Sequence, residues 1–254
     1  MLETVGSLTQ EGCQMNPKRI LLVTLFVLTV IASASNGYAM PLFADTSKRA
    51  VFLSPIEEWR STWNLEEYVS LLESAGYQVD VLMNGNVSIS FLKSGLSDYD
   101  IIILRTDSFY YEGFSYFCTG EPVTDNASET FAQEISNREL HVGACIGFSA
   151  QFIRLNYLEN SLRPGLVFVI DGYSAELSSP FISAGASVYV GYYDAYPLGW
   201  GRIDALSIKW LSYLAKGNSV KEATPLLYNY LTGGHGDTAS WPTIFWYGNG
   251  TYKI

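Results

Sequence analysis

The fold follows from one stretch of the sequence, Leu-Arg-Pro-Gly-Leu-Val-Phe-Val-Ile-Asp-Gly-Tyr-Ser at residues 162–174. Within them, Leu166–Ile170 is a continuous apolar run that Pro164-Gly165 opens and Asp171-Gly172 closes. Such a run predicts a strand that is buried on both faces of a parallel sheet. In open α/β sheets, ligands and catalytic groups gather just beyond the carboxyl ends of the strands. The sequence therefore predicts a functional site at residues 171–174.

The segments around this strand alternate between strand and helix patterns. Strands are predicted at 49–54, 77–82, 100–106 and 244–247, and helices at 64–75 and 203–214. Strand and helix in alternation with short links predict a parallel sheet with right-handed crossovers. The predicted fold class is therefore α/β, a mostly parallel sheet flanked by helices on both faces. Two shorter segments depart from this rhythm: residues 109–117 are expected to be an aromatic loop, and residues 141–145 a short strand.

Local signals mark the ends of two of the helices. Asn64 with Glu67, and Ser219 with Glu222, have the spacing of a capping box, in which the two side chains satisfy backbone N–H groups at a helix start. Pro225 is expected to kink or shorten the helix that follows Ser219, because proline cannot donate a backbone hydrogen bond. Gly233-Gly234 is expected to end that helix.

Composition places limits on the partners of this protein. The 254 residues are 48% hydrophobic and 15% aromatic, which is typical of a folded domain with a sizeable core. Lys and Arg number 15 against 25 Asp and Glu, giving a net charge of −10. Nucleic acids and anionic membrane surfaces are bound through clustered Lys and Arg, and the sequence has no such cluster. We therefore expect neither as a partner.

The first 40 residues have the pattern of a targeting segment. Lys18-Arg19 precede the apolar run Ile20–Ile31, and small-residue sequences suited to a signal peptidase follow it. The run approaches the length of a membrane span if it extends to residue 39. Residues 1–40 are therefore predicted to be a signal peptide or a transmembrane anchor, and residues 41–254 the α/β domain. We expect the domain to be extracytoplasmic, either secreted or anchored by residues 20–39.

An exported chain would meet an oxidising compartment. Without the leader the cysteines are Cys118 and Cys145, which could form one disulfide or remain buried free thiols. Both alternatives stay open at this point. Asn86, Asn126 and Asn249 each begin an Asn-x-Ser/Thr sequon and would be glycosylation acceptors on an exported chain.

The order of elements from about residue 50 to residue 247 resembles caspase-like cysteine peptidases, including their prokaryotic members. Two buried segments carry the likeness, the strand predicted at 100–106 and the run Leu166–Ile170. Residues 117–122 resemble the loop that follows the first of these strands in prokaryotic relatives, and residues 182–191 the helix and strand that follow the second. The resemblance implies a caspase-like sandwich. It also implies that the first strand ends in the general-base His and the second in the nucleophilic Cys.

Both implied catalytic positions depart from that pattern, because Asp107 and Tyr173 occupy them. A Cys–His dyad works because the imidazolium stabilises a thiolate and then donates a proton to the leaving group. A carboxylate cannot become that cation, and a phenol with an ordinary pKa of about 10 is a poor acyl acceptor. The resemblance therefore implies a domain that does not cleave peptides by the family mechanism. We expect a non-catalytic pseudopeptidase that binds a protein or peptide partner.

The expected binding residues lie near the predicted strand ends. Asp107, Glu121 and Asp171 would form an acidic mouth that favours cationic ligands or a divalent ion, although Asp after a strand also commonly caps a turn. Tyr173 is expected to fill the place of the missing dyad and to hydrogen-bond to Asp107. The two histidines and two cysteines beyond the leader have no metal-binding spacing, so zinc is not expected, and the sequence assigns no metal site and no cofactor.

An aromatic rim is expected near the same edge of the sheet. It comprises Tyr192, Tyr193, Tyr196 and Trp200, which either offer a recognition surface or pack beneath a loop.

A rival hypothesis starts from the sequence Gly-Ala-Cys-Ile-Gly at 143–147. It resembles the nucleophile elbow of class I glutamine amidotransferases, a tight turn between strand and helix that exposes a thiol above a sheet. That family places a His-x-Glu motif far downstream. Here His235 and Asp237 would be the partners of Cys145 in a hydrolase active site.

Overall fold

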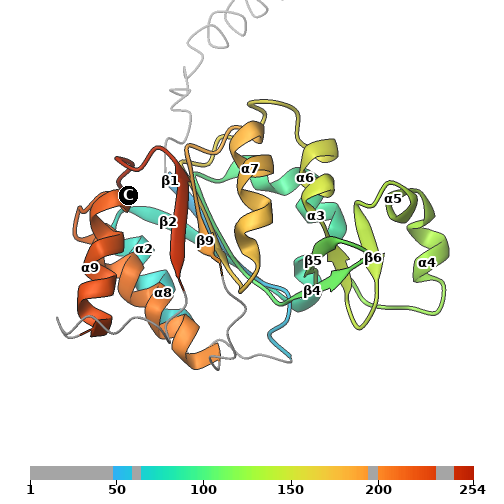
Figure 1. The fold of residues 1–254 in the computed structure, drawn as a ribbon, viewed down its shortest axis with the longest axis horizontal. Coiled ribbons are helices and arrows are strands. Elements are labelled where there is room, and N and C mark those ends of the chain that lie inside the picture. The colour runs from blue at the N-terminus through green and yellow to red at the C-terminus, as the bar shows by residue number, and fades with distance from the viewer. Residues whose placement is uncertain (1–47, 59–63, 194–199, 233–242) are drawn as a thin grey trace, which may run out of the picture. The chain divides into compact units, whose positions relative to one another are not determined.

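A six-stranded sheet forms the centre of the structure, a computed structural model that describes residues 48–58, 64–193, 200–232 and 243–254 (Figure 1). The strand order is β10-β9-β8-β3-β1-β2, and all neighbours are parallel except β10, which is antiparallel to β9. The strands are β1 (Lys48–Ser54), β2 (Tyr77–Met83), β3 (Ile101–Arg105), β8 (Leu166–Ile170), β9 (Val188–Tyr192) and β10 (Ile244–Gly248). The predicted mostly parallel sheet is therefore confirmed.

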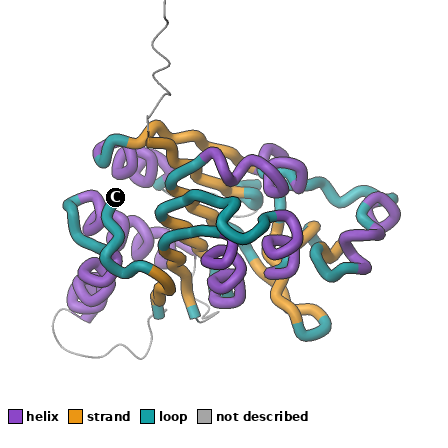
Figure 2. The backbone as a smooth tube through the Cα atoms, turned by 90° about the horizontal axis from the view of Figure 1, so that it is seen from above, coloured by secondary structure: helices purple, strands orange, loops and turns teal. Residues whose placement is uncertain are grey.

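Helices cover both faces of this sheet, as predicted (Figures 1 and 2). One face packs against α2 (Leu65–Ser74), α8 (Trp200–Ala215) and α9 (Val220–Thr232), and the other against α3 (Ile89–Ser94), α6 (Ala150–Asn156) and α7 (Ser178–Ala184). Side chains of a strand alternate between its two faces. Phe168 of β8 accordingly joins the α8 face, and its neighbours Val167 and Val169 join the other. This two-sided burial explains why β8 is apolar throughout.

A second, antiparallel sheet follows β3 in the chain. Its order is β4-β5-β7-β6, with β4 (Ser108–Tyr111), β5 (Phe114–Cys118), β6 (Leu140–Val142) and β7 (Ile146–Phe148). One sequence prediction was wrong here, and a second was right only in part. Residues 109–117 form a hairpin, whose turn places Glu112 and Gly113 at positive φ. The strand predicted at 141–145 ends at Val142, because the Gly143 N–H turns back to bond the Cys145 carbonyl.

Short helical turns complete the described part of the chain. They are η1 (Asn84–Asn86), η2 (Gly95–Asp98), α4 (Ala127–Thr130), α5 (Ala132–Ser136) and η3 (Ser174–Leu177).

The predicted helix signals had mixed outcomes. Ser219 and Glu222 form the capping box, with the Ser219 N–H and hydroxyl both donating to Glu222 Oε2 at 2.8 Å. Asn64 precedes α2 but makes no side-chain cap. Pro225 lies in the second turn of α9 and does not shorten it. The backbone carbonyl that loses its N–H donor is that of Lys221, which is exposed and can bond to water instead. Gly233 and Gly234 lie outside the described residues.

The leader predicted at residues 1–40 also lies outside the described residues. Within the part of the chain that the structure describes, no helix is long and apolar enough to cross a membrane. The three sequon asparagines, Asn86, Asn126 and Asn249, are all exposed, and their glycosylation stays a prediction.

A disulfide between Cys118 and Cys145 decides between the two alternatives left open for these cysteines. It connects the end of β5 to the turn between β6 and β7, and both residues are buried. Ile56, from the loop after β1, and Phe109 of β4 pack against it. The disulfide therefore holds the second sheet together and places it against the central sheet.

Replacing both cysteines by Ala should lower the free energy of unfolding by about 3.5 kcal/mol, the loop-closure entropy for a 27-residue separation. Urea unfolding of the wild-type chain and of the Cys118→Ala/Cys145→Ala chain measures the difference, with reduced wild type as a control. Equal midpoints for oxidised and reduced wild type would contradict a disulfide in the folded protein.

Candidate functional site

The two predicted dyad positions lie at neighbouring strand ends. β3 and β8 are adjacent and parallel, with Arg105 opposite Ile170 in register. The residues that follow, Asp107 and 171–174, therefore meet at one edge of the sheet, as predicted.

Asp171 is the buried acid of this edge, with only 4% of its surface exposed. Its Oδ2 accepts the Tyr173 N–H at 3.2 Å. Burial is the main cause that raises the pKa of Asp171 to about 6, and the negative charge of Asp107 raises it further. Hydrogen bonds from the Ser108 side chain and the Tyr173 N–H act in the opposite direction without cancelling the effect. The surroundings of Asp171 therefore do not offset the cost of burying its ionised form.

Asp107 is held beside Asp171 by its own backbone. Its Oδ1 accepts the Ser108 N–H at 3.1 Å, and its carbonyl accepts the Cys118 N–H at 2.8 Å. The preceding residue, Thr106, is fully buried and donates its hydroxyl to the Cys118 carbonyl at 2.7 Å. These bonds join the end of β3 to β5, so the position of Asp107 depends on both sheets.

Tyr173 does not fill the place of the missing dyad, because 53% of its surface is exposed. The next residue, Ser174, takes the interior position instead. The Ser174 hydroxyl accepts the Tyr192 N–H at 2.9 Å and so joins the end of β8 to β9. This bond fixes the turn after β8, and the Tyr173 side chain projects outward. The hydrogen bond expected between Tyr173 and Asp107 therefore does not fit the structure.

Glu121 contacts the start of α3 rather than the two aspartates, so the prediction of a three-residue acidic mouth was wrong. Its Oε2 accepts the Ile89 N–H at 3.1 Å, at the start of α3. Glu121 lines a pocket of about 370 Å³ near the ends of β1 and β2, together with Glu58 and Asn84. The path of the loop after β5 determines where Glu121 lies, and the number of residues between Glu121 and the aspartates does not predict that path.

Glu176 is a residue of this edge that sequence reasoning missed. Its Oε2 accepts the Ser115 N–H at 3.2 Å, which joins η3 to β5.

The rival hydrolase hypothesis is contradicted at its nucleophile. Cys145 is in a disulfide, and the residues around it form a turn between two antiparallel strands rather than a strand-to-helix elbow. His235 and Asp237 lie outside the described residues. The other histidine, His141, packs among aromatic rings of the second sheet, with the Tyr111 ring centroid 3.9 Å away. Burial lowers the pKa of His141.

The predicted aromatic rim is only partly present. Tyr192 is buried and its hydroxyl hydrogen-bonds to Ser207 at 2.8 Å, whereas Tyr193 is 46% exposed. The Tyr193 ring packs on Phe245 at 4.2 Å, and its hydroxyl lies 3.2 Å from the exposed Tyr247 hydroxyl. Tyr196 and the Trp200 side chain lie outside the described part of the chain.

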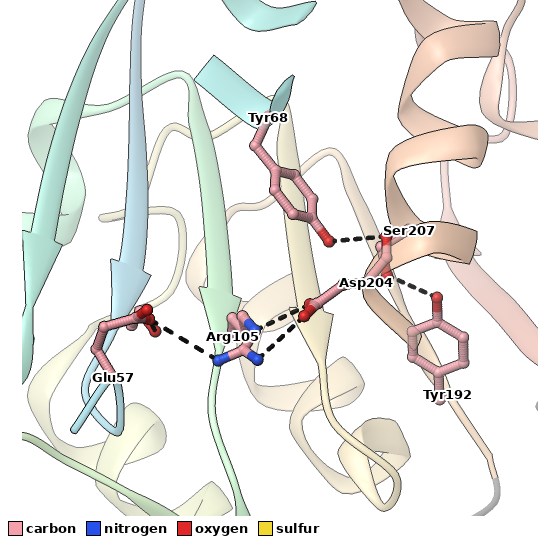
Figure 3. Close-up of polar contacts among 7 residues, drawn as sticks. Glu57, Tyr68, Arg105, Tyr192, Asp204 and Ser207 are labelled. Atoms are coloured by element: carbon pink, nitrogen blue, oxygen red, sulfur yellow. Dashed lines mark hydrogen bonds and ion pairs between the residues drawn. The ribbon is translucent and has the colours of Figure 1, made fainter. Parts of the chain in front are cut away.

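A buried ion pair supports the end of β3 (Figure 3). Arg105 is fully buried and donates from Nε and Nη2 to the two carboxylate oxygens of Asp204 on α8, at 2.9 and 3.0 Å. Glu57, after β1, lies 4.0 Å from Nη1 of the same guanidinium. Burial still raises the pKa of Asp204, although Arg105 opposes that effect. The only sequence signal for Arg105 was a cation at the end of an apolar strand.

Further hydrogen bonds surround Asp204 in the same core, and they involve Tyr68, Tyr192 and Ser207. The Tyr68 hydroxyl donates to the Asp204 backbone carbonyl at 3.2 Å, and both Tyr68 and Tyr192 hydrogen-bond to Ser207 (Figure 3). Three segments of the chain, α2, β9 and α8, therefore contribute to it.

Arg105→Met should reduce the free energy of unfolding by about 3–5 kcal/mol, because it leaves the Asp204 carboxylate buried without its partner. Arg105→Met/Asp204→Leu should recover most of that loss, because the buried Asp204 carboxylate is removed together with its partner and the remaining carboxylate, Glu57, is partly exposed to solvent. Chemical denaturation of the three chains measures both changes. A single variant as stable as wild type would contradict the ion pair.

Asp171→Asn should stabilise the protein near pH 8 by up to about 3 kcal/mol, since a pKa raised by roughly two units makes the ionised Asp171 unfavourable in the folded state. Below pH 6 the folded wild type takes up the proton, so the difference should shrink and vanish near pH 4. Thermal unfolding across this range measures it, with exposed Asp125→Asn as the control. A destabilisation of the same size at every pH would contradict the raised pKa.

Among the residues that the structure describes, no three His, Cys, Asp or Glu side chains gather at one place to hold a metal ion.

Comparisons with known proteins complete the description of the site. Neither a protein-family model nor a curated protein matches the sequence. Among solved structures, the chain is similar to the Drosophila initiator caspase Dronc, with a TM-score of 0.43 and 11% sequence identity over 81% of each chain. The α/β fold class rests on the strand order and the two helical layers, and membership of the caspase-like family stays a prediction.

Proposed function

We propose that this domain is a non-catalytic binding module that accepts a basic side chain of a partner peptide or protein. The observation that carries the proposal is the carboxylate pair of Asp107 and Asp171 at the neighbouring ends of β3 and β8.

The chemistry of the strand ends supports binding rather than peptide cleavage. Thiol catalysis requires a free thiolate, and both cysteines of the described residues are in a disulfide. Asp107 and Tyr173 stand where the resemblance to caspase-like peptidases places a His and a Cys. A bound peptide therefore meets acceptor oxygens at this edge, with neither a thiol nor an imidazole beside them in the described part of the chain.

The electrostatics of Asp171 support a cationic ligand. Ionised Asp171 is buried and lies close to a second negative charge, so a cation placed between the two carboxylates removes an unfavourable interaction. A Lys or Arg side chain fits this role better than a divalent ion, which needs six or more oxygen ligands. The exposed ring of Tyr173, two residues after Asp171, is available to contact the aliphatic stem or charged head of that side chain.

If residues 1–40 act as the predicted leader, this binding site would lie outside the cytoplasm. The partner would then be a secreted or surface protein, or a peptide derived from one.

The test uses fluorescence anisotropy with labelled peptide libraries that carry a central Lys or Arg, with acetyl-lysine and citrulline peptides as neutral counterparts. The full chain should bind the basic libraries at least tenfold more tightly, the effect of about 1.4 kcal/mol. Asp107→Asn and Asp171→Asn should each remove the preference, and Asp125→Asn should keep it. Mass spectrometry should recover the bound peptides intact.

Affinity for the basic peptides should fall as pH drops from 8 to 5, because protonation of Asp171 around pH 6 removes one of the two charges. Equal binding of charged and neutral peptides, or a preference that survives Asp171→Asn, would contradict the proposed site. Cleaved peptides would contradict the non-catalytic role.

A further inference from the structure

A pocket on a different part of the molecule is lined by positively charged side chains, in contrast to the acidic pair of Asp107 and Asp171. It has a volume of about 270 Å³ and lies between the start of β5, the end of α5 and one face of α6. Its lining residues are Phe114, Asn137, Arg138, Ala150, Gln151 and Arg154. Two of these carry guanidinium groups and none carries a carboxylate, although the chain as a whole has a net charge of −10.

Arg138 is held in place by both its backbone and its side chain. Its backbone has φ of +59°, its N–H donates to the Ile135 carbonyl at 2.9 Å, and its own carbonyl accepts the Ser149 hydroxyl at 2.6 Å. Its guanidinium lies over the Phe114 ring, 5.0 Å from the centroid. Stacking on an aromatic face leaves the N–H groups at the edge of the guanidinium able to donate. The Arg138 side chain is therefore oriented before any ligand arrives.

Arg154 reaches the same pocket from α6. It lies three residues after Gln151 and four after Ala150, a spacing that places all three on one face of the helix. In the described residues neither Arg138 nor Arg154 forms an ion pair, in contrast to Arg49 with Asp80 and Lys93 with Glu134.

The carboxylate nearest to Arg138 in sequence is already engaged. Glu139 is buried, and its two oxygens accept hydrogen bonds from the side-chain amides of Asn137 at 3.1 Å and Asn156 at 2.9 Å.

We propose that this pocket binds a compact oxyanion through Arg138 and Arg154, with the Gln151 amide as a further donor. The planar fork of a guanidinium matches the oxygens of a carboxylate or a phosphate, and two guanidiniums around one pocket complement a single anionic group. Two sources have this chemistry, a phosphate monoester and a carboxylate. The site is independent of the acidic pair at Asp107 and Asp171, so either can fail without the other.

The test follows the arginine Nε–Hε and backbone amide resonances of the full chain by NMR during titration with inorganic phosphate or acetate. Ionic strength is held constant with chloride. The signals of Arg138, Gln151 and Arg154 should shift saturably, with a Kd of about 1–10 mM for a single small anion. A lower Kd for phosphate assigns the pocket to phosphate monoesters, and a lower Kd for acetate assigns it to carboxylates.

Arg138→Gln and Arg154→Gln should each weaken binding about tenfold, since each removes a charge-assisted hydrogen-bond donor. Both arginines are exposed, so the variants should fold, and unchanged unfolding temperatures check this. Exposed Arg163→Gln is the matched control and should bind like wild type. The proposal is overturned if neither anion gives a saturable shift, or if the two pocket variants bind as well as the control.

Discussion

The buried ion pair between Arg105 and Asp204 is the interaction on which the candidate site depends. Removing two charges from water is costly, and only bidentate geometry with further hydrogen bonds offsets that cost. Here Asp204 of α8 provides the bidentate geometry, its backbone carbonyl accepts a further bond from Tyr68, and the last residue of β3 is thereby fixed. Because Arg105 is fixed in the core, the positions of the next two residues, Thr106 and Asp107, are restricted as well. We infer that this pair specifies where β3 ends as much as it contributes to stability.

Hydrogen bonds across the strand ends extend this constraint to the neighbouring elements. Ser174 joins β8 to β9, Thr106 joins β3 to β5, and Glu176 joins η3 to β5. The disulfide of Cys118 then connects β5 to the remainder of the second sheet. These contacts leave Asp107 and Asp171 close together in a position with little solvent. The unfavourable charge on Asp171 is thus a product of the whole arrangement, and it is the reason why we propose a cationic ligand.

The central sheet could be predicted from the sequence because the signals for its strands and helices each lie within a few neighbouring residues. The apolar run Leu166–Ile170 and the capping box at Ser219 each lie within a few residues, and both are present in the structure. The site was harder to predict because its contacts join distant segments. Arg105 and Asp204 are 99 residues apart, and the pairing of Cys118 with Cys145 depends on strands of three to five residues whose patterns are weak. The strand ends were placed correctly, whereas Tyr173 and Glu121 were misplaced because turn geometry decides where they point.

The most direct test of this account is the titration of the Asp171 carboxyl carbon, followed by carbon NMR in the selectively labelled full chain and assigned with Asp171→Asn. We expect a pKa of about 6 for Asp171 in the free protein. This pKa should decrease clearly when a lysine-containing peptide is added, because the bound cation favours the ionised form. A titration near the ordinary value of about 3.9, unchanged by the peptide, would contradict the acidic binding site.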